Sequence, residues 1–110
     1  MKPLRQQHWS QQAFDCVNKH RGDQKEQEYR RFAKRFPSLI HGCGLAQAWA
    51  FAAATKQEAL LEDIEMVLGE QRLAERSRQS SLAEYLRLSR DSLQAAGWIK
   101  RYAEALLKGE

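Results

Sequence analysis

The chain has 110 residues, 43% of them apolar, and carries a formal net charge of +4. A chain of this length forms one domain, here residues 1–110, and buries about 65% of its unfolded surface without needing disulfides or metals. It contains no run of the roughly 18 apolar residues that a bilayer span needs, and its first residues lack the apolar stretch of a secretory signal, so we expect a cytoplasmic protein.

Apolar residues recur at helical spacing along nearly the whole chain, and the alternation typical of strands is missing. The first helix is predicted over residues 4–20, with an inward stripe that consists of Trp9, Ala13, Cys16, Val17 and His20. The segment Arg21-Gly22-Asp23 ends it, because glycine suits the left-handed C-terminal position and aspartate suits the start of the next helix. The sequence therefore predicts an all-α fold.

A second helix is predicted over residues 24–36. Its buried side is formed by Tyr29, Phe32, Ala33 and Phe36. Pro37 ends or kinks this helix, because proline lacks the backbone N–H and restricts the residue before it. A turn through Gly42-Cys43-Gly44 then leads into the next helix.

Residues 45–56 are predicted to form the central helix of the molecule. Leu45, Ala48, Trp49 and Ala52 share one stripe, while alanines and Phe51 cover the other faces. Because a helix without a polar side is surrounded by protein, we expect a compact bundle of five or six helices around this buried central helix. The helical pattern resumes after it, with or without a break, as far as Leu68.

The polar, arginine-rich residues 70–81 are predicted to form a frayed helix end and a mobile loop. The arginines in this segment, interpreted as residues that favour solubility, are Arg72, Arg76 and Arg78. Ser81 and Glu84 then form a capping box for a short helix that reaches Leu88.

A closing helix is predicted to begin at Ser89 or Asp91 and to end at Gly109. Apolar residues cover more than half of its circumference, which exceeds the stripe of ~100° that a surface helix needs. Either this helix is buried on two sides within the bundle, or one of its sides faces a partner.

Four cations lie on the second predicted helix, opposite its apolar stripe: Arg30, Arg31, Lys34 and Arg35. Like charges at this spacing repel each other by roughly a few tenths of a kcal/mol per pair, and a phosphate backbone would relieve the repulsion. Residues 1–56 contain ten Lys or Arg against four acids, whereas residues 57–110 contain eight against ten, which also favours a polyanionic partner. This basic face is our first candidate for nucleic-acid contact, and a solvated helix face is the alternative.

Other groupings of reactive side chains favour ordinary structural roles. Cys16 and His20, with His41 and Cys43, could supply four zinc ligands, but they lack the spacing of a zinc knuckle, so we predict no metal and no cofactor. Two lone cysteines in a reducing compartment are expected to be free thiols. The acidic residues of segment 58–65 point outward beside no histidine, and no nucleophile has a base at motif spacing. We therefore expect no enzymatic activity.

Two segments resemble a known family. The first has the form P-x-L-I-x-x-x-G-L-x-Q-x-x-A-F and is filled by Pro37, Leu39, Ile40, Gly44, Leu45, Gln47, Ala50 and Phe51. The second has the form W-x-K-R-aromatic-A-x-x-L and is filled by Trp98, Lys100, Arg101, Tyr102, Ala103 and Leu106. In order, spacing and length the chain resembles the small subunit of the type III-B CRISPR effector, the Cmr complex. One departure is Cys43, where family members often have asparagine.

The resemblance implies a non-catalytic subunit whose copies stack along an RNA-guided complex, beside other Cmr subunits, and help to hold guide and target RNA. It also implies that Lys100 and Arg101 contact RNA or a neighbouring subunit. Without the resemblance, both side chains are as well explained by snorkelling or by pairing with Glu104. No membrane and no small-molecule substrate is expected.

Two alternatives remain at this stage. The first is a stand-alone helical regulator that binds DNA through a helix-turn-helix within residues 81–102, although Arg90 is the only cation there before Lys100. The second is a small metal-dependent nuclease that uses the carboxylates of Glu58, Glu62 and Glu65.

Overall fold

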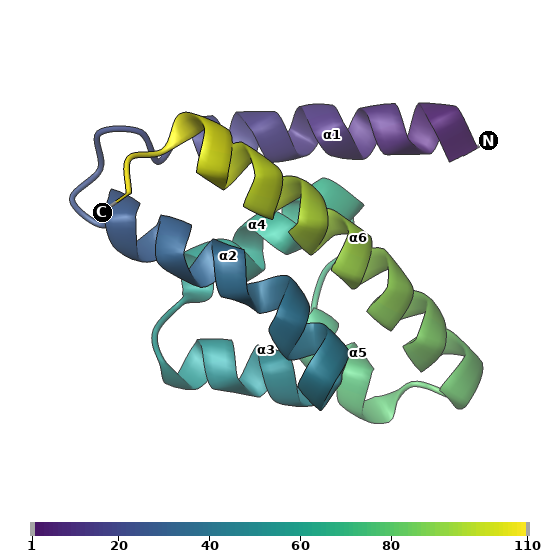
Figure 1. The fold of residues 1–110 in the computed structure, drawn as a ribbon. Helices are drawn as coiled ribbons and strands as arrows, with labels where there is room; N and C mark the ends of the chain where they lie inside the picture. The colour runs from purple at the N-terminus through teal and green to yellow at the C-terminus, as the bar shows by residue number, and fades with distance from the viewer. Residues whose placement is uncertain (1, 110) are drawn as a thin grey trace.

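The computed structural model describes residues 2–109, which form six helices and no strand (Figure 1). The helices are α1 Lys2–Asn18, α2 Glu26–Cys43, α3 Leu45–Ala54, α4 Glu58–Leu68, α5 Leu73–Gln79 and α6 Leu82–Leu106. The predicted all-α bundle is confirmed. Within these residues no helix combines the length and the apolar character that crossing a bilayer would require.

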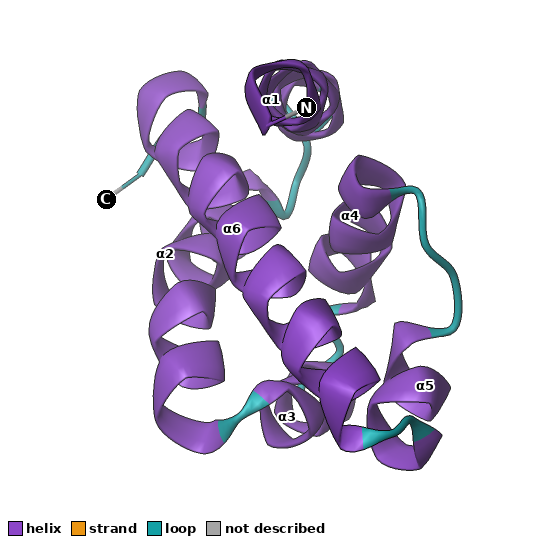
Figure 2. Cartoon of the chain, turned by 90° about the vertical axis from the view of Figure 1, so that its right-hand side faces the viewer, coloured by secondary structure: helices purple, strands orange, loops and turns teal. Residues whose placement is uncertain are grey.

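The longest helix, α6, lies at the centre of the bundle and contacts each of the other five. Figure 2 shows α1 end-on above it, with α2 and α4 on opposite sides of it. Its buried side is rich in small residues, namely Ser92, Ala95, Ala96 and Ala103. Small side chains allow neighbouring helices to approach closely.

The predicted break near Ser89 and Asp91 is wrong, because α6 runs from Leu82 to Leu106 without interruption. Aspartate favours helix starts in isolation, but the Asp91 carboxylate is 4% exposed and pairs with Arg5 at 2.5 Å and with Arg87 at 3.3 Å. The predicted N-cap at Ser81 is confirmed, since the Glu84 N–H donates to Ser81 Oγ at 3.2 Å, whereas the Glu84 carboxylate binds Arg76 and Arg87 and does not complete a capping box.

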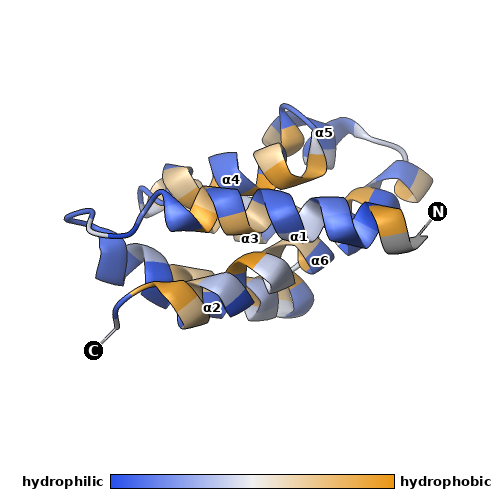
Figure 3. Ribbon diagram, turned by 90° about the horizontal axis from the view of Figure 1, so that it is seen from above, coloured by the Kyte–Doolittle hydropathy of each residue, from blue (hydrophilic) through white to orange (hydrophobic). Residues whose placement is uncertain are grey.

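Helix α2 continues through Pro37 to Cys43, so of the two effects predicted for Pro37, an end or a kink of the helix, the end is wrong. Phe36 and Ile40, on either side of Pro37, are both buried on the same helix face, and their burial offsets the one missing backbone hydrogen bond. The helix is capped by Gly44, whose N–H donates to Ile40 O at 2.9 Å. Along α1 and α2, hydrophilic residues alternate with hydrophobic ones (Figure 3), as expected of helices with one solvent face.

Helix α3 is half-exposed, which corrects the prediction of a buried central helix. Leu45, Ala48, Trp49 and Ala52 are buried as predicted, whereas Phe51 is 42% exposed. Ala50, Ala53 and Ala54 are exposed as well. Alanine favours helices whether or not it is buried, because its side chain loses no conformational entropy when the helix forms. The alanines of this segment therefore indicate that it is helical, but they do not indicate that it is buried.

A tight turn separates α3 from α4. Lys56 adopts a positive φ of 61°, and the Gln57 N–H donates to Ala52 O at 2.8 Å. The helical pattern that resumes after residue 56 therefore belongs to a separate helix.

Residues 73–79 form helix α5, so the predicted mobile loop over residues 70–81 is wrong. Leu73 is completely buried, and its N–H donates to Glu65 Oε2 at 3.0 Å. Arg76 binds both Glu70 and Glu84. An arginine expected to favour solubility therefore joins α5 to α6.

Gly44 gives a test of the α2–α3 junction. Its φ of 88° and ψ of 159° lie in a region that is essentially restricted to glycine, and a Cβ there would lie 3.3 Å from the Tyr85 hydroxyl oxygen. We expect Gly44→Ala to lower the free energy of unfolding by about 2 kcal/mol, measured by urea denaturation.

Gly42→Ala is the matched control, because Gly42 lies within α2 and a Cβ there meets no atom within 4 Å. It should raise the free energy of unfolding by about 0.5 kcal/mol. Equal effects of the two substitutions would contradict the assigned backbone conformation of Gly44.

The ion pairs of α6 give a second test. Hydrogen bonds from Arg87, and next from Arg76, lower the pKa of Glu84 to about 2. A depressed carboxylate pKa contributes stability that is present above the ordinary pKa and is lost as the pH falls from there towards 2. Carbon-detected NMR titration should show Glu84 ionised until about pH 2, and Arg87→Gln should raise its pKa towards the ordinary value.

Arg78→Gln is the control for this titration, since Arg78 Nη1 donates to Ala74 O and does not bind Glu84. It should leave the titration curve of Glu84 unchanged. An ordinary Glu84 pKa in the unsubstituted chain would show that the two arginines do not bind it in solution.

Candidate nucleic-acid interface

The predicted basic face lies on the outer side of α2. Its helical periodicity buries Tyr29, Phe32, Ala33 and Phe36 and turns the four cations outward. Arg31, Lys34 and Arg35 are exposed, whereas Arg30 is half-buried. The face is therefore formed, but its four members do not have equal access to solvent.

Arg30 lies against the C-terminal tail. A Cβ added to Gly109 would overlap its guanidinium group, and its Nε is buried without a hydrogen-bond partner among the described residues. The tail is held there by Glu26, which accepts a hydrogen bond from the Lys108 N–H at 2.8 Å. Arg30 thus has a structural contact in addition to its charge.

A shallow hollow next to this tail is lined by Gln27, Arg30, Arg31, Lys34 and Gly109. Three of these five residues are cations and none is an acid. A hollow of this composition suits an anionic group.

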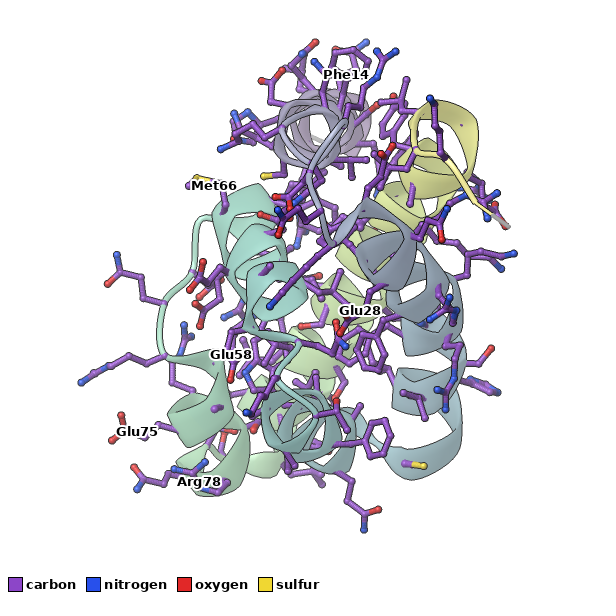
Figure 4. The ribbon with its side chains drawn as sticks, turned by 90° about the vertical axis from the view of Figure 1, so that its left-hand side faces the viewer. Phe14, Glu28, Glu58, Met66, Glu75 and Arg78 are labelled. Atoms are coloured by element: carbon purple, nitrogen blue, oxygen red, sulfur yellow. The ribbon has the colours of Figure 1, made fainter. Side chains whose placement is uncertain are left out.

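A second hollow lies between α2 and α3, and we name it the α2–α3 groove. Its lining residues are Glu28, Arg31, Phe32, Arg35, Phe51, Thr55 and Gln57. Arg35 Cζ lies 5.9 Å from the centre of the Phe51 ring. The Glu28 carboxylate accepts a hydrogen bond from Gln57 Nε2 at 2.9 Å, and Figure 4 shows Glu28 on α2.

Sequence reasoning misses Phe51 as a candidate functional residue. Its position opposite the Leu45–Trp49 stripe is visible in the sequence, but an apolar pattern on every side assigns the whole helix to the core. A large aromatic residue that faces away from a helix's buried stripe is the signal for a surface role.

Lys100 and Arg101 lie apart from the two hollows on α2, neither of which they line. Lys100 is half-buried, and Arg101 is exposed with its Cζ 6.0 Å from the centre of the Trp98 ring. A role of this pair in binding stays a prediction.

The second apolar side of α6 is partly covered by α1. Trp98 Nε1 donates to Gln6 Oε1 at 2.9 Å, and the hydroxyl groups of Tyr102 and Ser10 lie 2.7 Å apart. Trp98 and Tyr102 are half-buried and Ala105 is exposed, so this side of the helix is packed in part within the bundle and stays in part open to a partner.

The four zinc-ligand candidates do not form a site. His20 Nε2 lies 2.9 Å from Asp63 Oδ2, and its ring stacks on Tyr29 with centroids 3.9 Å apart. Cys16 is buried, while Cys43 is exposed at the far end of α2. Within residues 2–109 no three His, Cys, Asp or Glu side chains are grouped so that they would hold a metal ion.

Over residues 2–109 the structure lacks the helix-turn-helix that a DNA-binding regulator needs, and one of the carboxylates that a nuclease would need binds another group of the protein. Within residues 82–106 the chain is one continuous helix, so the predicted helix-turn-helix is wrong. Glu62 and Glu65 line a hollow with Glu70, but Glu65 binds the Leu73 N–H and Glu70 binds two arginines. The carboxylates of Glu65 and Glu70 therefore stabilise the entry to α5.

Comparison with known proteins decides the family. Residues 5–106 match the sequence model of the family described as CRISPR-associated protein (Cas_Cmr5). The chain belongs to the CRISPR-associated Cmr5 family. The resemblance carried by the segments around Gly44 and Trp98 is thereby confirmed, and both segments lie within the matched range.

Two relatives of the Cmr5 family agree with this result. The chain is 40% identical to the CRISPR system Cmr subunit Cmr5 of Thermus thermophilus, over 94% of this chain and 96% of the relative. It also superimposes on the crystal structure of a CRISPR-associated Cmr5 family protein from Thermus thermophilus. In that comparison the TM-score is 0.89 and the identity 39%, covering 94% of this chain and 97% of the other.

The two cysteines should differ strongly in reactivity. Burial, together with the nearby Asp63 carboxylate, raises the pKa of Cys16 to about 11, whereas Cys43 is exposed. Since the thiolate is the reactive species, one thiol per chain should react with Ellman's reagent at pH 8 in the folded protein, and two in denaturant. Cys43→Ser should abolish the reaction of the folded protein, and Cys16→Ser should leave it unchanged.

Proposed function

We propose that this chain is the non-catalytic small subunit of a type III-B CRISPR (Cmr) complex in the cytoplasm, and that it helps to hold guide and target RNA through phosphate contacts. The observation that carries the proposal is the exposed cationic face of α2 in a member of the Cmr5 family. The relative from Thermus thermophilus is named as a Cmr subunit, which supports the same assembly for this chain.

The chemistry of α2 supports binding to the RNA backbone. Arg31, Lys34 and Arg35 are exposed on successive turns, and neutralising phosphates with such side chains releases counterions from the RNA. Contacts to phosphate fix the position of a nucleic acid without reading its sequence. Pairing between guide and target then supplies the specificity, and cleavage belongs to other subunits.

Exposed apolar side chains support contacts with neighbouring subunits, both copies of this chain and other Cmr proteins. Leu82 is 74% exposed and Leu86, one turn later on α6, is 55% exposed. Met66, 56% exposed, lies at the outside of α4 (Figure 4). We assign Lys100 and Arg101 to contacts with RNA or with such a neighbouring subunit. We assign residues 1–110 to a single domain.

The RNA contacts are tested by reversing charge on α2 within the assembled complex. Substituting Arg30, Arg31, Lys34 and Arg35 by glutamate should weaken target RNA binding and flatten its salt dependence, because each lost phosphate contact removes about 0.7–0.9 from the slope of log K against log salt. Affinities are measured by fluorescence anisotropy at several salt concentrations.

Two further variants serve as controls, one for misfolding and one for a general effect of charge. A triple variant keeps Arg30, which packs against Gly109. A control reverses four exposed cations elsewhere, namely Lys19, Arg21, Arg72 and Arg78. If both α2 variants bind RNA as the control does, with an unchanged salt slope, α2 does not contact the RNA backbone.

A further inference from the structure

The α2–α3 groove combines an exposed aromatic ring with arginines, a composition that phosphate contacts alone do not need. Phe51 is 42% exposed although it is a large apolar residue. Arg31 and Arg35 line the same groove. Aromatic rings beside cations are typical of surfaces on which single-stranded nucleic acids stack their bases.

The Phe51 ring is supported on one side by the protein. Phe32, which is buried in α2, lies with its ring centre 6.1 Å from that of Phe51 and with an interplanar angle of 21°. A ring that is held by a buried aromatic neighbour keeps its orientation in the unbound state. Stacking on such a ring costs little ordering entropy.

Arg35 covers the Phe51 ring only loosely. Its Cζ lies 5.9 Å from the ring centre, close to the outer limit of about 6 Å for a cation–π contact. The Arg35 side chain is exposed and long, so it can move aside while its charge stays at the groove. An incoming flat ring can therefore take the place of the guanidinium group over Phe51.

The rim of the groove adds polar groups. Gln57 places an amide there, which offers hydrogen-bond donors and an acceptor. Glu28 is the one acid among the lining residues, and its carboxylate is bound to that amide. With two arginines against this one carboxylate, the lining carries a net positive charge beside its aromatic surface.

We propose that the α2–α3 groove binds one unpaired nucleobase of RNA, which stacks on Phe51 while Arg31 and Arg35 contact the adjoining phosphates. This inference rests on the proposed function, because it requires an RNA strand that follows α2. It goes further in assigning a base-binding position and a preference for single-stranded over duplex RNA. A base inside a duplex has both of its faces stacked and cannot reach Phe51.

A protein partner is the competing occupant of the groove. A protein interface usually has a central apolar area from which charged residues are depleted. Here one exposed aromatic residue shares the lining with two arginines, and the only other aromatic lining residue is the buried Phe32. The composition therefore favours a nucleotide.

The test compares binding of a short unstructured RNA with binding of the same RNA annealed to its complement, using the full chain at low salt. Phe51→Ala should weaken single-strand binding about tenfold and leave duplex binding unchanged. Phe51→Trp should retain the affinity, whereas Phe51→Leu, which keeps the apolar surface without the flat ring, should lose it.

Phe14→Ala is the matched control. Phe14 is 37% exposed and has an edge contact with Tyr102, and it projects outward from α1, away from the groove (Figure 4). This substitution should leave the binding of both RNAs unchanged. A loss equal to that of Phe51→Ala would mean that general destabilisation causes the effect, and would overturn the inference.

Crosslinking locates the base. A single-stranded RNA with 5-bromouridine should crosslink under ultraviolet light to a peptide that contains Phe51, and the duplex should not. Unchanged single-strand affinity of Phe51→Ala, or no RNA binding by the unsubstituted chain, overturns the inference. It is likewise overturned if Phe51→Ala releases a copurifying protein and leaves RNA binding intact.

Failure of this inference is distinguishable from failure of the proposed function. Substitution of Phe51 leaves the charge of α2 unchanged, and the charge-reversed α2 variants keep Phe51 in place. If only the charge variants lose RNA, the backbone contacts stand and the base-binding position is wrong. If neither kind of variant changes RNA binding, both proposals are wrong.

Discussion

The packing of small residues along α6 is the constraint on which the rest of the structure depends. Ser92, Ala95, Ala96 and Ala103 are at most 1% exposed, and every other helix contacts α6. Helices approach closely only where the side chains between them are small. The longest helix therefore occupies the centre, and the shorter helices are arranged around it (Figure 1).

The surface proposed for RNA follows from that arrangement. Because α6 and not α3 occupies the centre, α3 packs at the edge of the bundle and buries only the stripe formed by Leu45, Ala48, Trp49 and Ala52. Its opposite face stays open beside the cations of α2, and the α2–α3 groove forms where Phe51 meets Arg35. A fully buried α3 would have left α2 with charge but without an aromatic surface.

The sequence predicts those parts of the fold that depend on local pattern. The stripes of α1 and α2 follow from helical period, and the cap at Ser81 follows from hydrogen-bonding geometry.

Prediction from the sequence fails where residues far away in the chain determine the local structure. Helix α5 depends on Glu65, Glu70 and Glu84, which lie outside it. Asp91 lies inside a helix because Arg5, from α1, neutralises it. The outward position of the α2 cations is predictable from helical periodicity. The exposure of Phe51 is not, because the alanines around it make the whole helix look apolar.

The distribution of ion pairs makes the molecule more asymmetric than its net charge of +4 indicates. Arg76 and Arg87 share the carboxylates of Glu70 and Glu84, so these charges largely cancel within the α5–α6 side. Lys34 and Arg35 have no ion pair with any described residue, and Glu28 is bound to an amide. Charges paired at a few ångströms contribute little to the field beyond about 10 Å in salt, so Lys34 and Arg35 contribute more to the outward field than Arg76 and Arg87 do. The surface proposed for RNA thus combines the charges of Lys34 and Arg35 on α2 with the aromatic surface of Phe51 on α3.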